Sequence, residues 1–447
     1  MLGGAATIVA LTAVGGSGQA RTRPPVRILR GPPAEVDARL RPIVNTIAAR
    51  VERLRGLEFE RRPRVVVMDE PRIAAVARQI ARRQRRHAQR HPSRLRSSQR
   101  LQRASIEFDQ LAGLLPSETG LGPDIRASGL EQVGGAFDYP RDRIIIVPAV
   151  IQSRIQLDLT LAHELTHALE DQHFHLHLGT FAQPGDVSSA HRAVIEGSAT
   201  LIQSRYEHRY LGDDVRVAER IDGLRSLLAT GSAPYAINAQ AIFDYVDGAQ
   251  FIRSVYRRAG NWSLVDRALR APPRQSQEIL HPGRWPVEAS PDPIRLGIGG
   301  ALQGGWRRVG GGSAGEEQAL VILLAAPLGG AAQLGASGWD GGHFAVWRPR
   351  SEHDCGSDCV VDDVGVVAFR WRHLRDASQF SLAVPGYATL GLLAQPFTNH
   401  VWKRSDGYLA LGSASRASAL AFAPDDRLAR ELAQRAARRA GHGGGGL

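Results

Sequence analysis

Lysine is almost absent from this chain of 447 residues. Lys403 is the only lysine among 56 basic residues, and the others are arginines. The formal charge of +12 favours anionic partners in general, but such a bias toward arginine is typical of a GC-rich coding sequence rather than of phosphate binding. Cysteine is also scarce. Cys355 and Cys359 form either a small local disulfide loop or two free thiols, and they exclude a disulfide framework and a four-cysteine zinc site. We expect no specific nucleic-acid partner.

Long apolar segments are missing as well. No apolar run reaches about 18 residues, so no transmembrane span is expected. Residues 1–20 have an apolar centre at 5–14 and end in small residues before Arg21, which is the pattern of a cleavable export signal. No basic residue precedes the apolar centre, so a simple apolar tail is the alternative. We interpret 1–20 as a signal peptide and expect a secreted, extracytoplasmic bacterial protein.

The length and a hydrophobic content of 43% indicate two globular domains with appendages. Prolines at 272–273 and 282–293 place the boundary near Pro291. We divide the chain into a signal peptide, an N-terminal segment with an arginine-rich helical insertion, a mostly helical domain, a smaller α+β domain and a helical, glycine-rich tail, with bounds at 1–20, 21–115, 116–290, 291–425 and 426–447.

Hydrophobic periodicity predicts the main elements of both domains. Helices are expected at 34–57, 151–173, 188–210, 376–384 and 424–440. Strands are expected at 65–68, 143–147, 344–347 and 364–370, with a hairpin around 405–407. The arginine-rich run 72–102 is interpreted as a solvated helix or a poorly ordered insertion, because no aromatic residues alternate with its charges. A grip on an acidic polymer is the alternative.

One motif carries chemistry: His163-Glu164-Leu165-Thr166-His167, an H-E-x-x-H inside an apolar helical pattern. Residues four apart on a helix lie on the same face about 6 Å apart along the axis, so both imidazoles can bind one tetrahedral metal ion. Glu164 is placed to accept a proton from metal-activated water and to pass it to the leaving amine. This pattern is typical of zinc hydrolases.

A catalytic zinc needs a third protein ligand. His173 has a spacing known from one class of zinc sites, but Glu170 stands where that class has a helix-breaking glycine, and in an unbroken helix His173 lies about 15 Å from His163. Glu196 is the better candidate. It follows His167 by 29 residues, lies on the next predicted helix, and is followed by the small Gly197, which permits close approach of the helices.

These residues resemble the gluzincin metallopeptidases, in which H-E-x-x-H on one helix and a glutamate on the next hold zinc. The helix of His163 also resembles that of thermolysin-type enzymes, although Thr200 stands where those enzymes place a supporting aspartate. A group of bacterial and archaeal proteins regarded as secreted zinc peptidases is more similar. Its motifs match His163 to Phe174, Ile195 to Thr200, Tyr245 to Gly248, Ser276 to Pro282 and parts of a C-terminal module, so the resemblance spans about Val133 to Phe380.

The resemblance implies an α+β fold: a mostly helical, zincin-like catalytic domain with a small edge sheet, followed by a smaller α+β domain. It implies Zn²⁺ held by His163, His167 and Glu196. Asp171 is a candidate hydrogen-bond partner of one imidazole or a plain surface residue. His281 and Tyr245 are candidate donors to the oxyanion of the reaction.

We therefore predict a zinc-dependent metallopeptidase that cleaves polypeptide, since the strand before the H-E-x-x-H helix could pair with an extended substrate. Two alternatives remain open: a non-catalytic zinc protein that binds anionic polymers, and a zinc hydrolase of a non-peptide amide or ester. His173, His175 and His177 alternate along the chain and are interpreted as a solvated cluster rather than as a second metal site.

Overall fold

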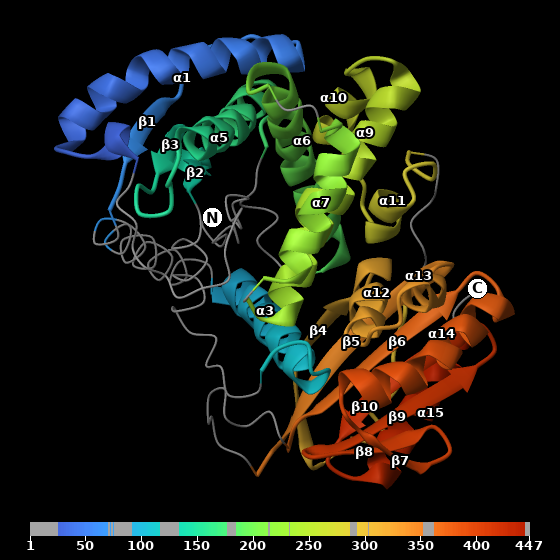
Figure 1. The fold of residues 1–447 in the computed structure, drawn as a ribbon. Helices are drawn as coiled ribbons and strands as arrows, with labels where there is room; N and C mark the ends of the chain where they lie inside the picture. Colours follow the sequence, from blue (N-terminus) through green and yellow to red (C-terminus); the bar gives the residue numbers. More distant parts are fainter. Residues whose placement is uncertain are drawn as a thin grey trace.

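The structure is a computed structural model that describes residues 26–69, 72, 75, 92–116, 134–176, 185–212, 215–231, 233–286, 293–302, 304–351 and 362–442. Helices and sheets both contribute, so the predicted α+β class is confirmed. The elements gather in two units, which lie one above the other in Figure 1. Each unit has hydrophobic cores of its own.

The first unit is mostly helical and contains a three-stranded sheet in the order β1-β3-β2. Its strands are β1 (Arg64–Val67), β2 (Gly135–Asp138) and β3 (Arg143–Ile146). Its main helices are α1 (Pro33–Arg55), α5 (Arg154–Phe174), α6 (Asp186–Tyr210), α7 (Val217–Ala229), α8 (Tyr235–Ala241), the π-helical segment η4 (Ile242–Asp247), α9 (Gly248–Ala259), α10 (Ser263–Arg270) and α11 (Ser276–Leu280). Helix α5 lies at the centre, between α1, the sheet and α6.

The order of the small sheet corrects one expectation. Strand β3, which was expected to pair with a substrate, has both edges occupied, by β1 in parallel and by β2 in antiparallel pairing. The edge strands are β1 and β2 instead. In β2, Gly134 accepts a hydrogen bond from Val147, and because such bonds alternate along an antiparallel pair, the backbone groups of Gly135 and Phe137 face the edge that no described strand occupies.

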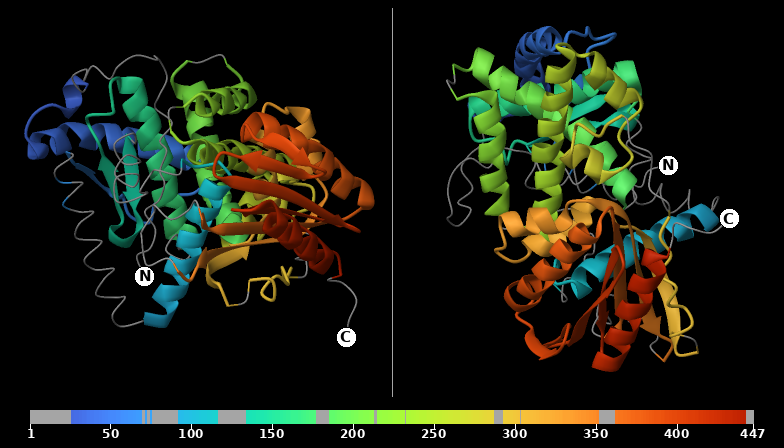
Figure 2. Two further views of the ribbon diagram at one scale, coloured as in Figure 1. Left: turned by 90° about the horizontal axis from the view of Figure 1, so that it is seen from below. Right: turned by 90° about the vertical axis from the view of Figure 1, so that its right-hand side faces the viewer.

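The second unit is built on a seven-stranded sheet in the order β4-β5-β6-β10-β9-β8-β7. Its strands are β4 (Trp306–Ser313), β5 (Trp339–Pro349), β6 (Val364–Trp371), β7 (Gln395–Thr398), β8 (Val401–Arg404), β9 (Gly407–Ala414) and β10 (Ala417–Ala423). Helices cover both faces, as Figure 2 shows. They are α3 (Pro92–Leu111), α12 (Glu316–Leu324), α13 (Gly330–Ala336), α14 (Leu374–Gly386) with the π-helical segment η6 (Tyr387–Gly391), and α15 (Asp426–Gly441).

Most predicted elements are present with small shifts of their ends. The helices expected at 34–57, 151–173, 188–210, 376–384 and 424–440 correspond to α1, α5, α6, α14 and α15, and the expected strands correspond to β1, β3, β5 and β6, with β8 and β9 as the hairpin. Strands β2, β4, β7 and β10 and the helices α7 to α13 were not predicted.

The predicted division of the chain differs from the observed packing at both ends. Residues 21–115 were expected to form one segment, but α1 and β1 join the core of the first unit, whereas α3 packs on β4, β5 and β6 of the second. The tail 426–447 was set apart from the α+β domain, yet α15 packs on β9 and β10 and buries its alanines there. Burial of apolar faces, rather than order in the sequence, decides both memberships.

Several expectations fall outside the described residues: the signal peptide 1–20, most of the arginine-rich run, Cys355 and Cys359, His177 and the boundary at Pro291. Within the part of the chain that the structure describes, no helix is both long enough and apolar enough to span a bilayer.

A network of polar groups joins the two units. The backbone N–H of Ser276 donates to Asp186 (2.9 Å), and the hydroxyl of Ser276 accepts from the backbone N–H of Glu317 (3.1 Å). His281 Nε2 lies 2.7 Å from Glu316 Oε1. A Cβ on Gly315 would lie 1.8 Å from Asp186 Oδ1, so only glycine permits this close contact.

Candidate metal centre

Helix α5 carries the H-E-x-x-H motif through the core of the first unit. The helix begins at a capping box in which Ser153 accepts from the N–H of Gln156, and the Gln156 side chain accepts from the N–H of Ser153. Its central residues are buried on all sides, His163, Glu164 and His167 among them. Burial of ionisable groups is costly unless they have partners, which indicates a site built for them.

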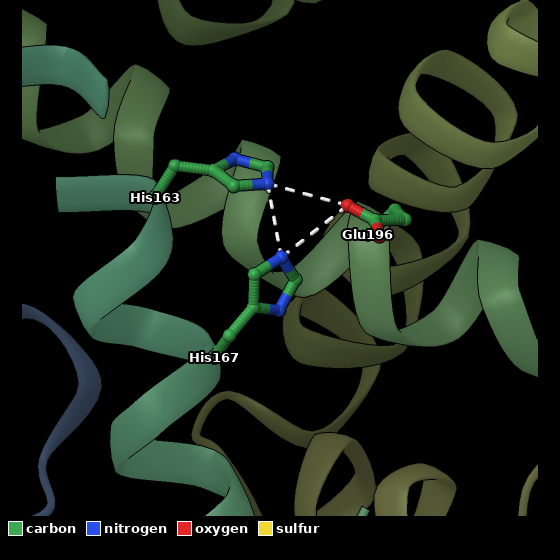
Figure 3. A group of neighbouring side chains, drawn as sticks. All are labelled: His163, His167 and Glu196. Carbon is green, nitrogen blue, oxygen red and sulfur yellow. Dashed lines mark hydrogen bonds and ion pairs between the residues drawn. The ribbon is translucent and has the colours of Figure 1, made fainter. Parts of the chain in front are cut away.

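The three predicted ligands converge (Figure 3). The Nε2 atoms of His163 and His167 lie 3.0 Å apart, and Glu196 Oε2 lies 3.2 Å from the first and 3.3 Å from the second. Among the described residues this is the one group of three or more His, Cys, Asp or Glu side chains with the spacing of metal ligands. Ligands about 2.05 Å from a tetrahedral zinc are separated by about 3.3 Å, so the donor set and its spacing fit zinc.

Charge also favours a cation here. Burial by itself raises the pKa of Glu196, but the imidazoles of His167 and His163 outweigh it and hold this pKa well below its ordinary value. The group is therefore a carboxylate, which is the form that binds metals.

The position of Glu196 depends on a close crossing of helices α6 and α9 at two glycines. A Cβ on Gly197 would lie 2.1 Å from the carbonyl carbon of Gly248, and one on Gly248 would lie 2.0 Å from the carbonyl oxygen of Ala193. Helices α6 and α9 therefore touch backbone to backbone beside the ligand. The sequence suggested that Gly197 lets α5 approach α6, whereas it is α9 that occupies this space.

The partners of the imidazoles differ from the expectation. His163 Nδ1 donates to Gln203 Oε1 of helix α6 (3.1 Å), which leaves the Nε2 lone pair facing the centre. His167 Nδ1 is buried and has no hydrogen-bond partner among the described residues, so Asp171 does not fill the role expected for it. Gln203 lies seven residues after Glu196, two helical turns along the same face, but no motif in the sequence marks it.

Glu164 lies beside the ligands and against the edge strand. It accepts a hydrogen bond from the backbone N–H of Phe137 in β2, and a Cβ on Gly135 would lie 3.3 Å from its Cγ. Burial is the largest influence on its pKa, and the negative charge of Glu196 adds to it; His163 and Phe137 act in the opposite direction, and the pKa is raised to about 7. Such a carboxyl exchanges protons near neutral pH.

Two tyrosines flank the ligands. The ring centroid of Tyr245, one of the predicted candidates, lies 6.0 Å from that of His163, and the ring centroid of Tyr139 lies 6.2 Å from that of His167. Burial first, and then the charge of Glu196, raise the pKa of both phenols well above the ordinary value. Both hydroxyls stay protonated and can donate. Tyr139 was noted only as part of a turn, because its proximity to His167 arises from the packing of that turn on α5.

Two other candidates lie elsewhere. His281 was expected near the reaction centre, but its imidazole contacts Glu316 of α12 at the junction of the two units. His173 points away from the ligands, and its Nε2 donates to the carbonyl of Glu58 (2.8 Å). Helix α5 continues without a break through Glu170, whose carboxylate binds Arg55 and Ser198, so His173 cannot turn back toward the centre.

Comparison of the whole chain with protein-family models, with curated proteins and with solved structures found no match. The residues of the site and their geometry therefore carry the functional assignment.

Proposed function

We propose that this chain is a zinc-dependent metallopeptidase in which His163, His167 and Glu196 hold the metal. The single observation that carries the proposal is the meeting of two imidazole nitrogens and one carboxylate oxygen, 3.0 to 3.3 Å apart, from two helices. With Glu164 in the same buried site, the set has the composition of a catalytic rather than a structural zinc site. A gluzincin-type, zincin-like first unit is part of the proposal.

When bound, zinc polarises a carbonyl group and makes water more acidic. The chain's own residues supply the proton handling. Glu164 accepts the proton of the attacking water and returns it to the leaving nitrogen, and its raised pKa suits both directions of transfer. The N–H of Phe137 fixes the orientation of this carboxylate. The phenols of Tyr245 and Tyr139 are donors for the negative charge that develops on the substrate oxygen.

The edge strand supports polypeptide as the substrate class. The outward backbone groups of Gly135 and the outward carbonyl of Phe137 belong to the strand whose Phe137 N–H donates to Glu164. An extended peptide that adds to this edge would run past the carboxylate that handles the proton. This edge takes the role that the sequence had assigned to the central strand β3.

The deciding experiment combines zinc content with hydrolysis of a casein-type substrate. Glu164→Gln should keep one zinc per chain and lose activity by about 100- to 10,000-fold, because only the proton acceptor is removed. Glu196→Ala should lose both zinc and activity. His173→Ala is the matched control and should keep both, since its imidazole is bonded to the carbonyl of Glu58, away from the ligands. Stoichiometric zinc in Glu196→Ala, or full activity in Glu164→Gln, would refute the assignment.

The same wild-type and variant proteins also distinguish this function from the two alternative functions. A non-catalytic zinc protein would show no hydrolysis by the wild type, with zinc bound. A hydrolase of non-peptide amides or esters would leave casein intact but cleave small acyl substrates, and Glu164→Gln would abolish that cleavage.

A further inference from the structure

The second unit has a groove on the face of the large sheet that α15 covers. The segment 293–302 packs on this face, and its side chains Ile294, Leu296 and Ile298 are buried in the same core as the alanines of α15. Between this segment and the strands β4 and β5 lies a groove of about 310 Å³. This volume is at the lower end of the range for sites that bind small organic molecules.

Most of the lining of the groove is apolar. Ile294, Leu296 and Ile298 form one wall, and Ala345 and Trp347 of β5 lie opposite them. The period of two along a strand places both β5 side chains on the α15 side of the sheet. A hydrocarbon group that enters the groove covers these surfaces and removes them from water, which favours binding. The groove therefore suits a molecule with an apolar body.

Positive charge lies at the same groove. Arg308 of β4, which is paired with Trp347 across the strands, and Arg295 of the segment both line it and are exposed. The side chain of Arg439 reaches it from α15, since a Cβ on Gly297 would lie 2.7 Å from Arg439 Cγ. None of these three guanidinium groups has a hydrogen bond or an ion pair within the described part of the chain. The lining contains no Asp or Glu, so the charge is available to an anion.

His343 adds an uncharged donor beside Arg308. It lies on β5 two residues before Ala345, so its side chain is on the same face of the sheet and lines the groove. Burial first, and then the charge of Arg308, lower the pKa of His343 to about 4. The imidazole is therefore neutral near pH 7 and has one N–H to donate. No described residue makes a hydrogen bond to this half-buried ring, although such groups ordinarily have a partner.

We propose that this groove binds a small carboxylic acid with an apolar body, such as a medium-chain fatty acid, as its carboxylate. The carboxylate accepts hydrogen bonds from Arg308 and His343, and the hydrocarbon chain lies along Trp347 and Ile298. The groove is in the second unit and shares no residue with the metal centre. The proposal therefore does not depend on the proposed peptidase function.

A phosphate ester is the competing anion. Protein sites for phosphate commonly use the backbone N–H groups at the start of a helix, but none of the residues that line the groove lies in the first turn of a helix. The two oxygens of a carboxylate match the two parallel donors of one guanidinium group. A carboxylate is therefore the anion that fits this groove.

The test is the binding of octanoate to the full chain by isothermal titration calorimetry. One octanoate per chain should bind in a saturable manner, and octanol, which lacks the charge, should bind about ten-fold more weakly or less. Higher salt should weaken the binding of octanoate but not that of octanol. Arg308→Gln should weaken octanoate binding about ten-fold, because it removes the charged donor, and should leave octanol binding unchanged.

Arg427→Gln is the matched control, because Arg427 is exposed on α15 about 18 Å from Arg439 along the helix axis. It should bind octanoate as the wild type does. Glu196→Ala is the second control. A carboxylate can also bind to a zinc ion, and this variant lacks a metal ligand, so it should keep octanoate binding if the groove is the site.

All variants should show the circular dichroism of the wild type. The absence of saturable octanoate binding, or an equal affinity for octanol, would overturn the proposal. Tighter binding of octyl phosphate than of octanoate would overturn the choice of a carboxylate. Unchanged binding in Arg308→Gln, or loss of binding in Glu196→Ala, would show that octanoate binds elsewhere.

Discussion

Helices α5 and α14 depart from the usual placement of side chains in opposite directions. Helix α5 buries His163, Glu164, His167 and Glu170 inside the first unit, and α14 leaves Leu374 and Leu382 in solvent. Buried polar groups cost free energy unless each has a partner, and exposed leucines forgo the free energy of burial. In both places the sequence departs from what folding alone would favour, which is where function is expected.

The two departures also differ in how they depend on neighbours. The polar groups of α5 are supported by side chains of α1 and α6 and by a backbone N–H of β2, all within the same chain. The leucines of α14 are exposed and have no such support in the described residues. Changes at α5 should therefore alter the stability of the chain, whereas changes at α14 should leave it nearly constant.

The largest effect is expected from Arg55→Met. Arg55 is fully buried and binds both Glu170 (2.5 Å) and Asp266 (2.6 Å). Its removal leaves Glu170 as a buried charge with Ser198 as its remaining partner, which should lower the free energy of unfolding by about 3–5 kcal/mol in urea titrations. Arg53→Met, at an exposed position of the same helix, is the control. The double variant Arg55→Met, Glu170→Leu should recover most of the loss; no recovery would mean that packing, not charge, was disturbed.

Gly197→Ala should have the next largest effect on stability. The added methyl meets the backbone of Gly248, which cannot move aside as a side chain would. We expect a loss of about 3 kcal/mol in unfolding free energy and weaker zinc binding, because the backbone beside Glu196 must shift. Gly223→Ala is the control, since open space surrounds Gly223 on α7, and that variant should gain stability. An unchanged zinc affinity in Gly197→Ala would show that the crossing of α6 and α9 does not determine the geometry of the metal centre.

A smaller, pH-dependent effect is expected at the junction of the units. Burial is the main cause that raises the pKa of Asp186 to about 6. Because the folded-state pKa lies above the unfolded one, its contribution is complete below about pH 4 and is lost as pH rises through 6. Asp186→Asn does not titrate there. Its unfolding free energy should equal that of the wild type at pH 4 and exceed it by roughly 2 kcal/mol at pH 8. A difference that is constant with pH would contradict this assignment.

The smallest effect is expected at Leu393. Leu393→Gly removes the left-handed strain of a leucine and should raise the unfolding free energy by about 0.5 kcal/mol in urea titrations. A clear loss of stability would show that contacts of the Leu393 side chain matter more than the strain of its backbone.

The sequence predicted the long elements and the ligand candidates, and it did so for a local reason. The four-residue spacing of His163 and His167 places both rings on one side of any helix, whatever lies around it. The rejection of His173 followed from the same geometry, because nothing breaks the helix before it. Glu196 was recognised by its spacing and by the resemblance to a family, and a lone helical glutamate would otherwise have been read as solvated.

Tertiary packing decided the rest. Gln203, Tyr139 and the edge strand β2 reach the site from α6, a turn and the sheet, and their approach depends on how helices and strands pack rather than on any repeat in the sequence. Tertiary packing also decided three other features: the crossing of α6 and α9 at Gly197 and Gly248, the placement of α3 on the large sheet, and the contact between the two units. Helical periodicity is a property of neighbours in the chain, so the sequence alone determined it, whereas contacts between distant segments exist only once the whole chain has buried its apolar surface.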